Sequence, residues 1–241
     1  MTNPKSIEVA ASSARRPNGK PSGVSEPEQS SVGRVPWPRW PPQRIRATLD
    51  TAGWSSDASE GYSLKVNLAI DHLVVGSPDL DRGIKWITYR LGVAPVFGGV
   101  HDGFGTRNAL LGLGDQYLEV LALDPDQAGT SSPISKQVSS LTKPTLLTVA
   151  IAKSDLENPF SMSRVRADGV HLDWDLEFTS TPLFFIDWKD CPRPSGLPDG
   201  GRISSLAITT PDPASLAGVT GISVREGVWN IEATIDGKSL A

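Results

Sequence analysis

A short pattern, an apolar strand followed by polar residues and an aspartate, occurs three times in this chain. The copies read VVGSPDL at 74–80, AIAKSDL at 150–156 and AITTPDP at 207–213. A supersecondary pattern that recurs at intervals of several tens of residues indicates a fold built from repeated units. The repeat therefore constrains the fold more than any single motif in the sequence does.

The first unit is the most complete, and its pattern predicts the order β-α-β-β-β. VNLAIDHLVV, which begins at Val66, is rich in β-forming residues and predicts a buried strand. SPDLDRGIKWITYRLG predicts a helix with Ser77 as its N-cap and Gly92 as its stop. Three further strands are predicted at about 94–101, 106–113 and 116–123.

Two less complete units follow. PTLLTVAIA, VHLDWDLEF and PLFFIDW predict the strands of a second unit, and RISSLAITTPDPASLA, GISVREG and VWNIEATID predict a shortened third. The predicted fold class is therefore α+β, with repeated βαβββ modules. The predicted domain covers 66–241, with modules at 66–124, 144–190 and 202–236.

Residues 1–62 have a different composition from the rest of the chain. They contain eight of the 20 prolines, and RRPNGKPSG and RVPWPRWPPQR are rich in proline and arginine. Such a segment cannot bury enough apolar surface to offset the entropy of ordering, so we predict a disordered tail. An organelle transit peptide is disfavoured by Glu8, Glu26 and Glu28.

The composition of the whole chain narrows the functional classes. A formal net charge of -4 and the lack of a basic stripe argue against a nucleic-acid partner. No apolar run approaches the roughly 18 to 20 residues that cross a bilayer, so neither a membrane partner nor a membrane span is predicted. Cys191 is the only cysteine, which excludes an intrachain disulfide and a cysteine-based zinc site. The default prediction is a cytoplasmic protein.

GLGDQY begins like a dinucleotide-binding glycine motif but does not continue as one. Tyr117 stands where the third glycine should be, and a strand follows where the motif requires a helix. The segment is therefore a hairpin, and no nucleotide cofactor is predicted.

Glu119 is the least expected residue of the first unit. Its neighbours Leu118 and Val120 predict burial, and a buried carboxylate requires a metal, an arginine or strong hydrogen bonds. His72 lies within an apolar strand, and neutral imidazole is a common ligand of divalent metals. The alternative for His72 is a hydrogen-bonded histidine of the core.

His101, Arg107 and Asn108 are candidate substrate-binding residues. They lie in GGVHDGFGTRN, where glycines allow a ligand to approach the backbone and arginine offers a bidentate fork for a carboxylate or phosphate. The alternatives are an exposed His101, a turn amide at Asn108 and a salt bridge between Arg107 and Glu119.

The chain resembles the glyoxalase-like domain proteins of the vicinal oxygen chelate superfamily. The resemblance is carried by DHLVVGSPDLDRGIKWITYRLG, GGVHDGFGTRNALLGLGDQYLEVLALDP and PLFFIDW, and it extends from about Leu68 to at least Trp188. It implies paired modules whose mixed sheets curve around a cavity. In metal-dependent members, the first and last strands of each module supply the ligands.

Matched to that pattern, His72 and Glu119 take the first-strand and last-strand places of module one. The corresponding places fall on Thr148 and Asp187 in module two, and on Ser205 and Glu232 in module three. The resemblance thus implies a metal site of His72, Glu119 and Asp187, with Zn, Ni, Mn or Fe as the candidate ions. Thr148 departs from the pattern, because a threonine is a poor metal ligand.

Two functions follow from this resemblance. The first is a metal-dependent lyase or isomerase that acts on a small polar or anionic molecule, with Glu119 as the catalytic carboxylate that moves a proton. The second is a non-catalytic module that binds or sequesters a small molecule, like the bleomycin-resistance relatives. In either case a homodimer is an alternative to the monomer, because a second subunit could complete the cavity.

Deletion of residues 1–62 tests the predicted tail. Because this segment has little that could pack in a core, we expect the melting temperature of the shortened protein to stay nearly unchanged. Thermal unfolding of the full chain and the deletion variant measures this. A drop of several degrees would show that the tail packs on the domain.

Overall fold

The computed structural model describes residues 68–130, 132–165, 169–179, 181 and 183–240. The predicted tail, residues 1–62, lies outside the described residues. Within the described ranges the strands form an eight-stranded and a four-stranded sheet, and the α+β prediction is confirmed. In the same ranges, no helix has the length and apolar content needed to cross a bilayer.

The first half of the eight-stranded sheet has the predicted β-α-β-β-β order. Parallel pairing joins the first and last strands of this unit, and antiparallel pairing joins the others in sequence order. Its elements are β1 (Ala69–Gly76), α1 (Leu80–Leu91), β2 (Val96–His101), β3 (Thr106–Leu113) and β4 (Gln116–Leu123).

The start of α1 differs from the prediction by two residues. The N-cap is Asp79, whose side chain accepts a hydrogen bond from the backbone N–H of Arg82, and not Ser77. The Ser77 hydroxyl instead donates to the carbonyl oxygen of Asp79. A carboxylate also suits the positive end of the helix dipole, which favours aspartate at this position. Gly92 ends the helix in the left-handed conformation, as predicted.

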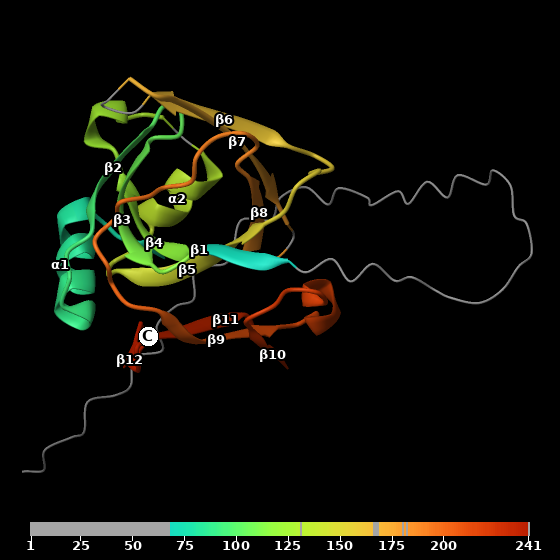
Figure 1. Cartoon of the computed structure of the whole chain (residues 1–241). Coiled ribbons are helices and arrows are strands. Elements are labelled where there is room, and N and C mark those ends of the chain that lie inside the picture. Colours follow the sequence, from blue (N-terminus) through green and yellow to red (C-terminus); the bar gives the residue numbers. More distant parts are fainter. Residues whose placement is uncertain (1–67, 131, 166–168, 180, 182, 241) are drawn as a thin grey trace, which may run out of the picture. The chain divides into compact units, whose positions relative to one another are not determined.

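The second half of the large sheet pairs with the first through its central strands. β1 lies antiparallel to β5, and β5 lies parallel to β8, so that the strand order is β2-β3-β4-β1-β5-β8-β7-β6. The sheet curves strongly, and the edge strands β2 and β6 approach each other (Figure 1). The additional strands are β5 (Thr145–Ala152), β6 (Phe160–Val165), β7 (His171–Phe178) and β8 (Leu183–Asp187).

A short 3-10 helix and one α-helix connect the two halves of the sheet. These are η1 (Pro125–Gln127) and α2 (Pro133–Ser139), and α2 packs near β4. The hydroxyl of Ser132 and the side chain of Ser135 form a capping box at the start of α2, which satisfies backbone donors there. Val138 of α2 is fully buried in a cluster with Val74, Leu121 and Leu147 of the central strands.

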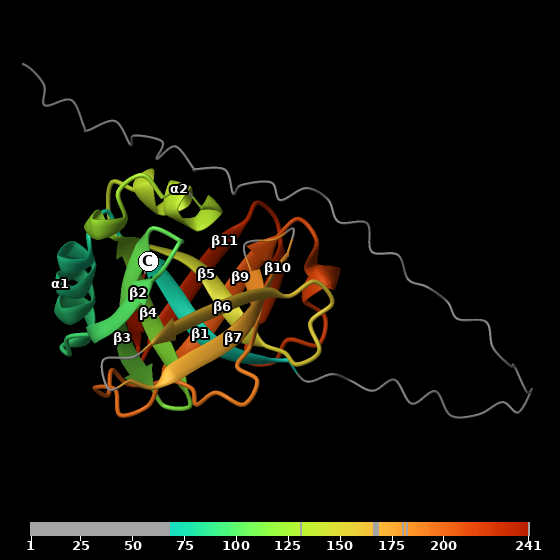
Figure 2. The same cartoon turned by 90° about the horizontal axis from the view of Figure 1, so that it is seen from above.

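The C-terminal segment forms the four-stranded sheet, in the order β10-β9-β11-β12. Its strand β11 contacts β5 of the large sheet, and the view in Figure 2 shows both strands. Its buried residues, among them Leu206, Ile208 and Ile235, belong to the same core as one face of the large sheet. α1 packs on that face too, through Leu80 and Ile87. The elements are β9 (Ile203–Thr210), the 3-10 helix η2 (Pro213–Leu216), β10 (Ser223–Glu226), β11 (Asn230–Ile235) and β12 (Lys238–Ser239).

The close contact between α1 and β4 generates a stability prediction at Gly83. A Cβ at this position would collide with Cγ1 of Val120 and lie 2.9 Å from Cβ of Ser77. Alanine is favoured over glycine within a helix by about 0.5–1 kcal/mol, but overpacking costs about 1–3 kcal/mol. We therefore expect Gly83→Ala to lower the free energy of unfolding by about 1–2 kcal/mol, measured by chemical denaturation.

A matched control for this variant is Lys85→Ala, at an exposed position of the same helix. Its free energy of unfolding should change by less than about 0.5 kcal/mol, because the side chain is not packed. A Gly83→Ala variant as stable as the parent would contradict the packing argument.

Candidate functional site

A cavity of about 110 Å³ lies on the face of the large sheet opposite α1. Side chains of a strand alternate between its two faces, and every second residue of several strands lines this cavity. In β3 these are Thr106, Asn108 and Leu110, and in β4 they include Tyr117 and Glu119. The cavity wall is therefore specified by the period of two along each strand.

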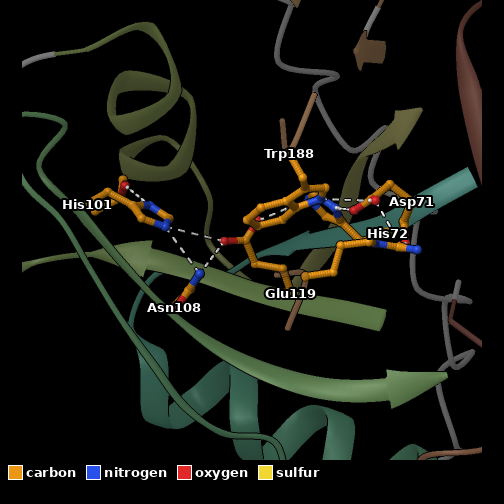
Figure 3. Close-up of polar contacts among 8 residues, drawn as sticks. Asp71, His72, His101, Asn108, Glu119 and Trp188 are labelled. Atoms are coloured by element: carbon orange, nitrogen blue, oxygen red, sulfur yellow. Dashed lines mark hydrogen bonds and ion pairs between the residues drawn. The ribbon is translucent and has the colours of Figure 1, made fainter. Parts of the chain in front are cut away.

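His72 and Asp71 contact each other although they are neighbours in β1. Ile70 pairs with Ile151 and His72 pairs with Ala150, so Asp71 is an extra residue in β1 at a β-bulge. Without a bulge, adjacent side chains would point to opposite faces of the sheet. Here Nδ1 of His72 lies 2.7 Å from Oδ1 of Asp71, and both residues are buried (Figure 3).

Asp71 is held by residues that follow β8 in the sequence. The indole Nε1–H of Trp188 donates to Oδ2 of Asp71 at 3.2 Å, and Nη2 of Arg193 lies 2.9 Å from the same oxygen. The guanidinium also donates to the carbonyl oxygen of Asp71. These contacts balance the charge of a carboxylate that has no exposed surface.

The environment of Asp71 keeps its carboxyl ionised. Burial would raise the pKa of this carboxyl, but the hydrogen bond and charge of His72 oppose that effect. With the additional contributions of Arg193 and Trp188, the pKa of Asp71 lies below its ordinary value. An ionised Asp71 can only accept, so Nδ1 of His72 carries the shared hydrogen and Nε2 faces the cavity.

Glu119 lies between two histidines on the cavity wall. Its Oε1 accepts a hydrogen bond of 2.6 Å from Nδ2 of Asn108. Nε2 of His72 lies 3.7 Å from Oε2, and Nε2 of His101 lies 3.7 Å from Oε1 (Figure 3). Both separations exceed the length of a direct hydrogen bond, so the carboxylate is only partly satisfied by the protein.

His101 is positioned by β3. Its Nδ1 lies 3.0 Å from Oγ1 of Thr106, and its Nε2 lies 3.2 Å from Nδ2 of Asn108. Burial lowers the pKa of His101, and the charge of Arg164 lowers it further, against the opposing effect of Glu119. The neutral imidazole is therefore favoured.

Tyr117 stacks on the imidazole of His72, with ring centroids 4.4 Å apart. Burial raises the pKa of Tyr117 well above its ordinary value, and the charges of Asp71 and Glu119 act in the same direction. The phenol therefore stays protonated at neutral pH. Together with Phe184, whose ring lies edge-on to His72, it fixes the plane of the imidazole.

The predicted site residues separate into two groups in the structure. His72, His101, Asn108 and Glu119 all line the cavity. Arg107 does not, because Thr106 and Asn108 point inward and the residue between them points to the other face of β3. The alternative salt bridge between Arg107 and Glu119 is also not formed in the described part of the chain, since Asn108 and the two histidines surround that carboxylate.

Asp187 also lies outside the cavity wall. Phe184 and Ile186 of β8 point inward, so Asp187 points outward, and its side chain accepts a hydrogen bond from the backbone N–H of Lys189. Assigning Asp187 to the last-strand place of module two therefore needs correction.

The strand register identifies the residue that takes the last-strand place. In module one, Val74, two residues after His72, pairs with Glu119. In module two, Ala150, two residues after Thr148, pairs with Phe184. Phe184 and Thr148 thus stand where Glu119 and His72 stand in module one.

This register decides whether the side chains fit a metal ion. The described residues include no group of three His, Cys, Asp or Glu side chains that could hold one. Module two contributes a phenyl ring and a hydroxyl where a four-ligand site requires a carboxylate and an imidazole. The set His72, Glu119 and Asp187 therefore does not match the donor set of a resident metal.

Sequence reasoning missed three residues of the site: Asp71, Trp188 and Arg193. The pair Asp71-His72 gave a weak signal, because an aspartate inside an apolar strand needs a partner. Trp188 and Arg193 gave none, because they reach Asp71 from 117 and 122 residues further along the chain.

A family model described as a glyoxalase-like domain matches residues 70–220. The chain belongs to this family. The match includes both halves of the cavity wall and the loop that carries Arg193, so the site lies within the family domain. Among curated protein sequences, no match was found.

Solved structures with similar folds include several members of enzyme families. A hypothetical protein from Staphylococcus aureus is 16% identical over 68% of this chain and 88% of its own, with a TM-score of 0.49. Methylmalonyl-CoA epimerase from Mycobacterium tuberculosis is 20% identical over 52% of this chain and 88% of its own, with a TM-score of 0.34.

A mutant of 4-hydroxymandelate synthase from Streptomyces coelicolor is 12% identical over 70% of this chain and 60% of its own, with a TM-score of 0.43. Because these three TM-scores lie below 0.5, the assignment of the family depends on the sequence match.

The Asp71 contacts generate a prediction about pH and stability. Because the folded-state pKa of Asp71 is depressed, its charge contributes stability that is fully present above the unfolded pKa, near 4, and is lost as pH falls through the lower folded value. We expect Asp71→Asn to lose about 2–3 kcal/mol of unfolding free energy at neutral pH, since Arg193 is partly exposed, and the difference should shrink below about pH 4.

Denaturant unfolding of both proteins between about pH 7 and pH 3 measures this difference. Asp187→Asn is the matched control, and its effect should stay within about 0.5 kcal/mol, because that side chain is only half-buried and points away from the cavity. A difference for Asp71→Asn that does not change with pH would contradict the assignment of the charge.

Proposed function

We propose that this protein binds a small molecule in the cavity and catalyses a proton transfer on it, as an isomerase or a lyase. The observation that carries the proposal is the chain of contacts Asp71–His72–Glu119. A buried carboxylate fixes one nitrogen of an imidazole, and the other nitrogen faces a second carboxylate across 3.7 Å of the cavity wall. Two proton-carrying groups that face one cavity support acid–base chemistry.

Glu119 is the proposed base. Its carboxylate removes a proton from the carbon next to a carbonyl group of the substrate, and the C–H electron pair becomes the carbon–carbon double bond of an enolate. His72 supplies a proton from Nε2 to the enolate oxygen, and the negative charge of Asp71 stabilises the imidazolium before that transfer. Return of a proton to a different carbon gives an isomerase, and loss of a neighbouring leaving group gives a lyase.

His101 and Asn108 have positioning roles in this proposal. The Asn108 amide donates to Oε1 of Glu119 and so leaves Oε2 facing His72. His101 adds a second imidazole beside the same carboxylate. Each step of the proposal is assigned to the protein's own groups.

The cavity wall that β6, β7 and β8 form supports a second candidate function. Met162, Trp174, Phe178 and Phe184 make that wall apolar, and a non-catalytic module that sequesters a small molecule requires little else. Turnover distinguishes the two candidates. The cytoplasmic location and the homodimer stay predictions from the sequence.

Exchange of carbon-bound hydrogen in heavy water tests the proposal. Phenylacetone and phenacyl alcohol carry such hydrogens next to a carbonyl, and nuclear magnetic resonance follows their replacement by deuterium. We expect the protein to accelerate the exchange of at least one probe, and Glu119→Gln to slow it by about 10²–10⁴-fold, because the general base is lost.

Glu232→Gln is the matched control, because Glu232 is exposed on β11 and bonded to Asn230. Its rate should equal that of the parent. Exchange no faster than in buffer, with either probe bound, would favour the non-catalytic module. A rate abolished by a chelator and restored by a divalent ion would contradict the assignment of the steps to protein groups alone.

A further inference from the structure

We propose that the ligand is an uncharged molecule with an apolar, ring-sized body and a hydroxyl group that hydrogen-bonds between Glu119 and His72. This inference rests on the proposed function for the location of the site, but it concerns binding and not turnover. It follows from the difference between the two walls of the cavity and from the 3.7 Å gap between Glu119 and His72 on the polar wall.

The wall formed by β6, β7 and β8 accounts for the apolar body. HLDWDLEF in β7 alternates, and its Trp174, Leu176 and Phe178 point inward. The rings of Trp174 and Trp188 lie 5.6 Å apart between centroids, and those of Phe178 and Phe184 lie 6.0 Å apart. These rings contact one another and form a continuous apolar wall, which suits a ligand that carries a ring or a compact hydrocarbon group.

Glu119 and His72 account for the hydroxyl group. Nε2 of His72 and Oε2 of Glu119 both face the cavity, and they lie 3.7 Å apart, beyond the length of a direct hydrogen bond. Because these two atoms do not hydrogen-bond to each other, a ligand group placed between them can bond to both. A hydroxyl between them donates to one atom, and it can accept from Nε2 when the imidazole is protonated.

Asn108 turns its amide donor, and not its amide oxygen, toward Glu119. Its Nδ2 donates to Glu119, while its Oδ1 is buried and accepts no hydrogen bond within the described residues. The carboxylate of Glu119 is the acceptor that faces the cavity, and a ligand that brings a donor to its Oε2 is therefore favoured over one that brings only acceptors.

The charges near the cavity disfavour an ionised ligand. A carboxylate or phosphate would approach Glu119, and Arg164 is the one Lys or Arg on the described part of the cavity wall. Its Nη1 already donates to the carbonyl oxygen of Gly98 at 2.9 Å. The positive charge of Arg164 also offsets the negative charge of Glu119. An ammonium group on the ligand therefore gains little over a neutral donor.

Four probes with one phenethyl-type body and different head groups test the inference. They are phenethyl alcohol, phenethyl methyl ether, hydrocinnamate and phenethylammonium, and ligand-observed magnetic resonance with the full chain gives their dissociation constants. We expect the alcohol to bind at least about 10-fold more tightly than the ether, which lacks the donor, and than either ion.

Glu119→Gln should reduce the preference for alcohol over ether to within about threefold, because the carboxylate acceptor is lost while the apolar wall is unchanged. Glu232→Gln should keep the full preference. The probe series on the unmodified protein decides the question even if Glu119→Gln does not fold.

The result that would overturn the inference is an ether or carboxylate bound as tightly as the alcohol. Tighter binding of the ammonium probe would show selection for positive charge instead, and binding of none of the four would contradict the proposed body. The outcome is separable from the proposed function, because alcohol preference without proton exchange would refute only the catalysis. Proton exchange without that preference would refute only the ligand class.

Discussion

The contact between Asp71 and His72 is the interaction on which the rest of the site depends. It exists because β1 contains one residue more than its partner β5 at this point, which brings two adjacent side chains together. The buried aspartate then requires compensation, and the segment after β8 supplies it through Trp188 and Arg193. The extra residue in β1 thus creates contacts between the centre of the sheet and the segment after β8, more than a hundred residues further along the chain.

The two modules make the same framework but different walls. In module one, His72 and Glu119 occupy the inward places of the first and last strands, and in module two the register assigns those places to Thr148 and Phe184. A symmetric arrangement would surround the cavity with ionisable groups from both sides. The observed arrangement places the carboxylate and imidazoles of the cavity wall on the module-one side, and it places Trp174, Phe178 and Phe184 together with Arg164 on the module-two side.

Sequence patterns were sufficient for the fold and for part of the site. Strand periodicity and the glycine at position 92 gave the elements of module one, and the carboxylate among leucines identified Glu119. The bulge at Asp71 has no local signature, and the pairing of β5 with β8 depends on tertiary packing, so Phe184 could not be distinguished from Asp187. Arg107 points outward because its neighbours Thr106 and Asn108 point into the cavity. The sequence alone does not show which face of the strand Asn108 occupies, so it could not predict the direction of Arg107.

The reactive residues and the ligand-shaping residues lie on different strands, so mutations during evolution can change one set without the other. Residues that would move protons lie on β1 and β4, whereas those that would shape the ligand lie on β6, β7 and β8. Exchanges of apolar residue size on the second set alter the space beside the ring-shaped body without touching the hydrogen bonds of Asp71 or Glu119. Duplicated modules of this kind can diversify in specificity while one half retains an unchanged reactive centre.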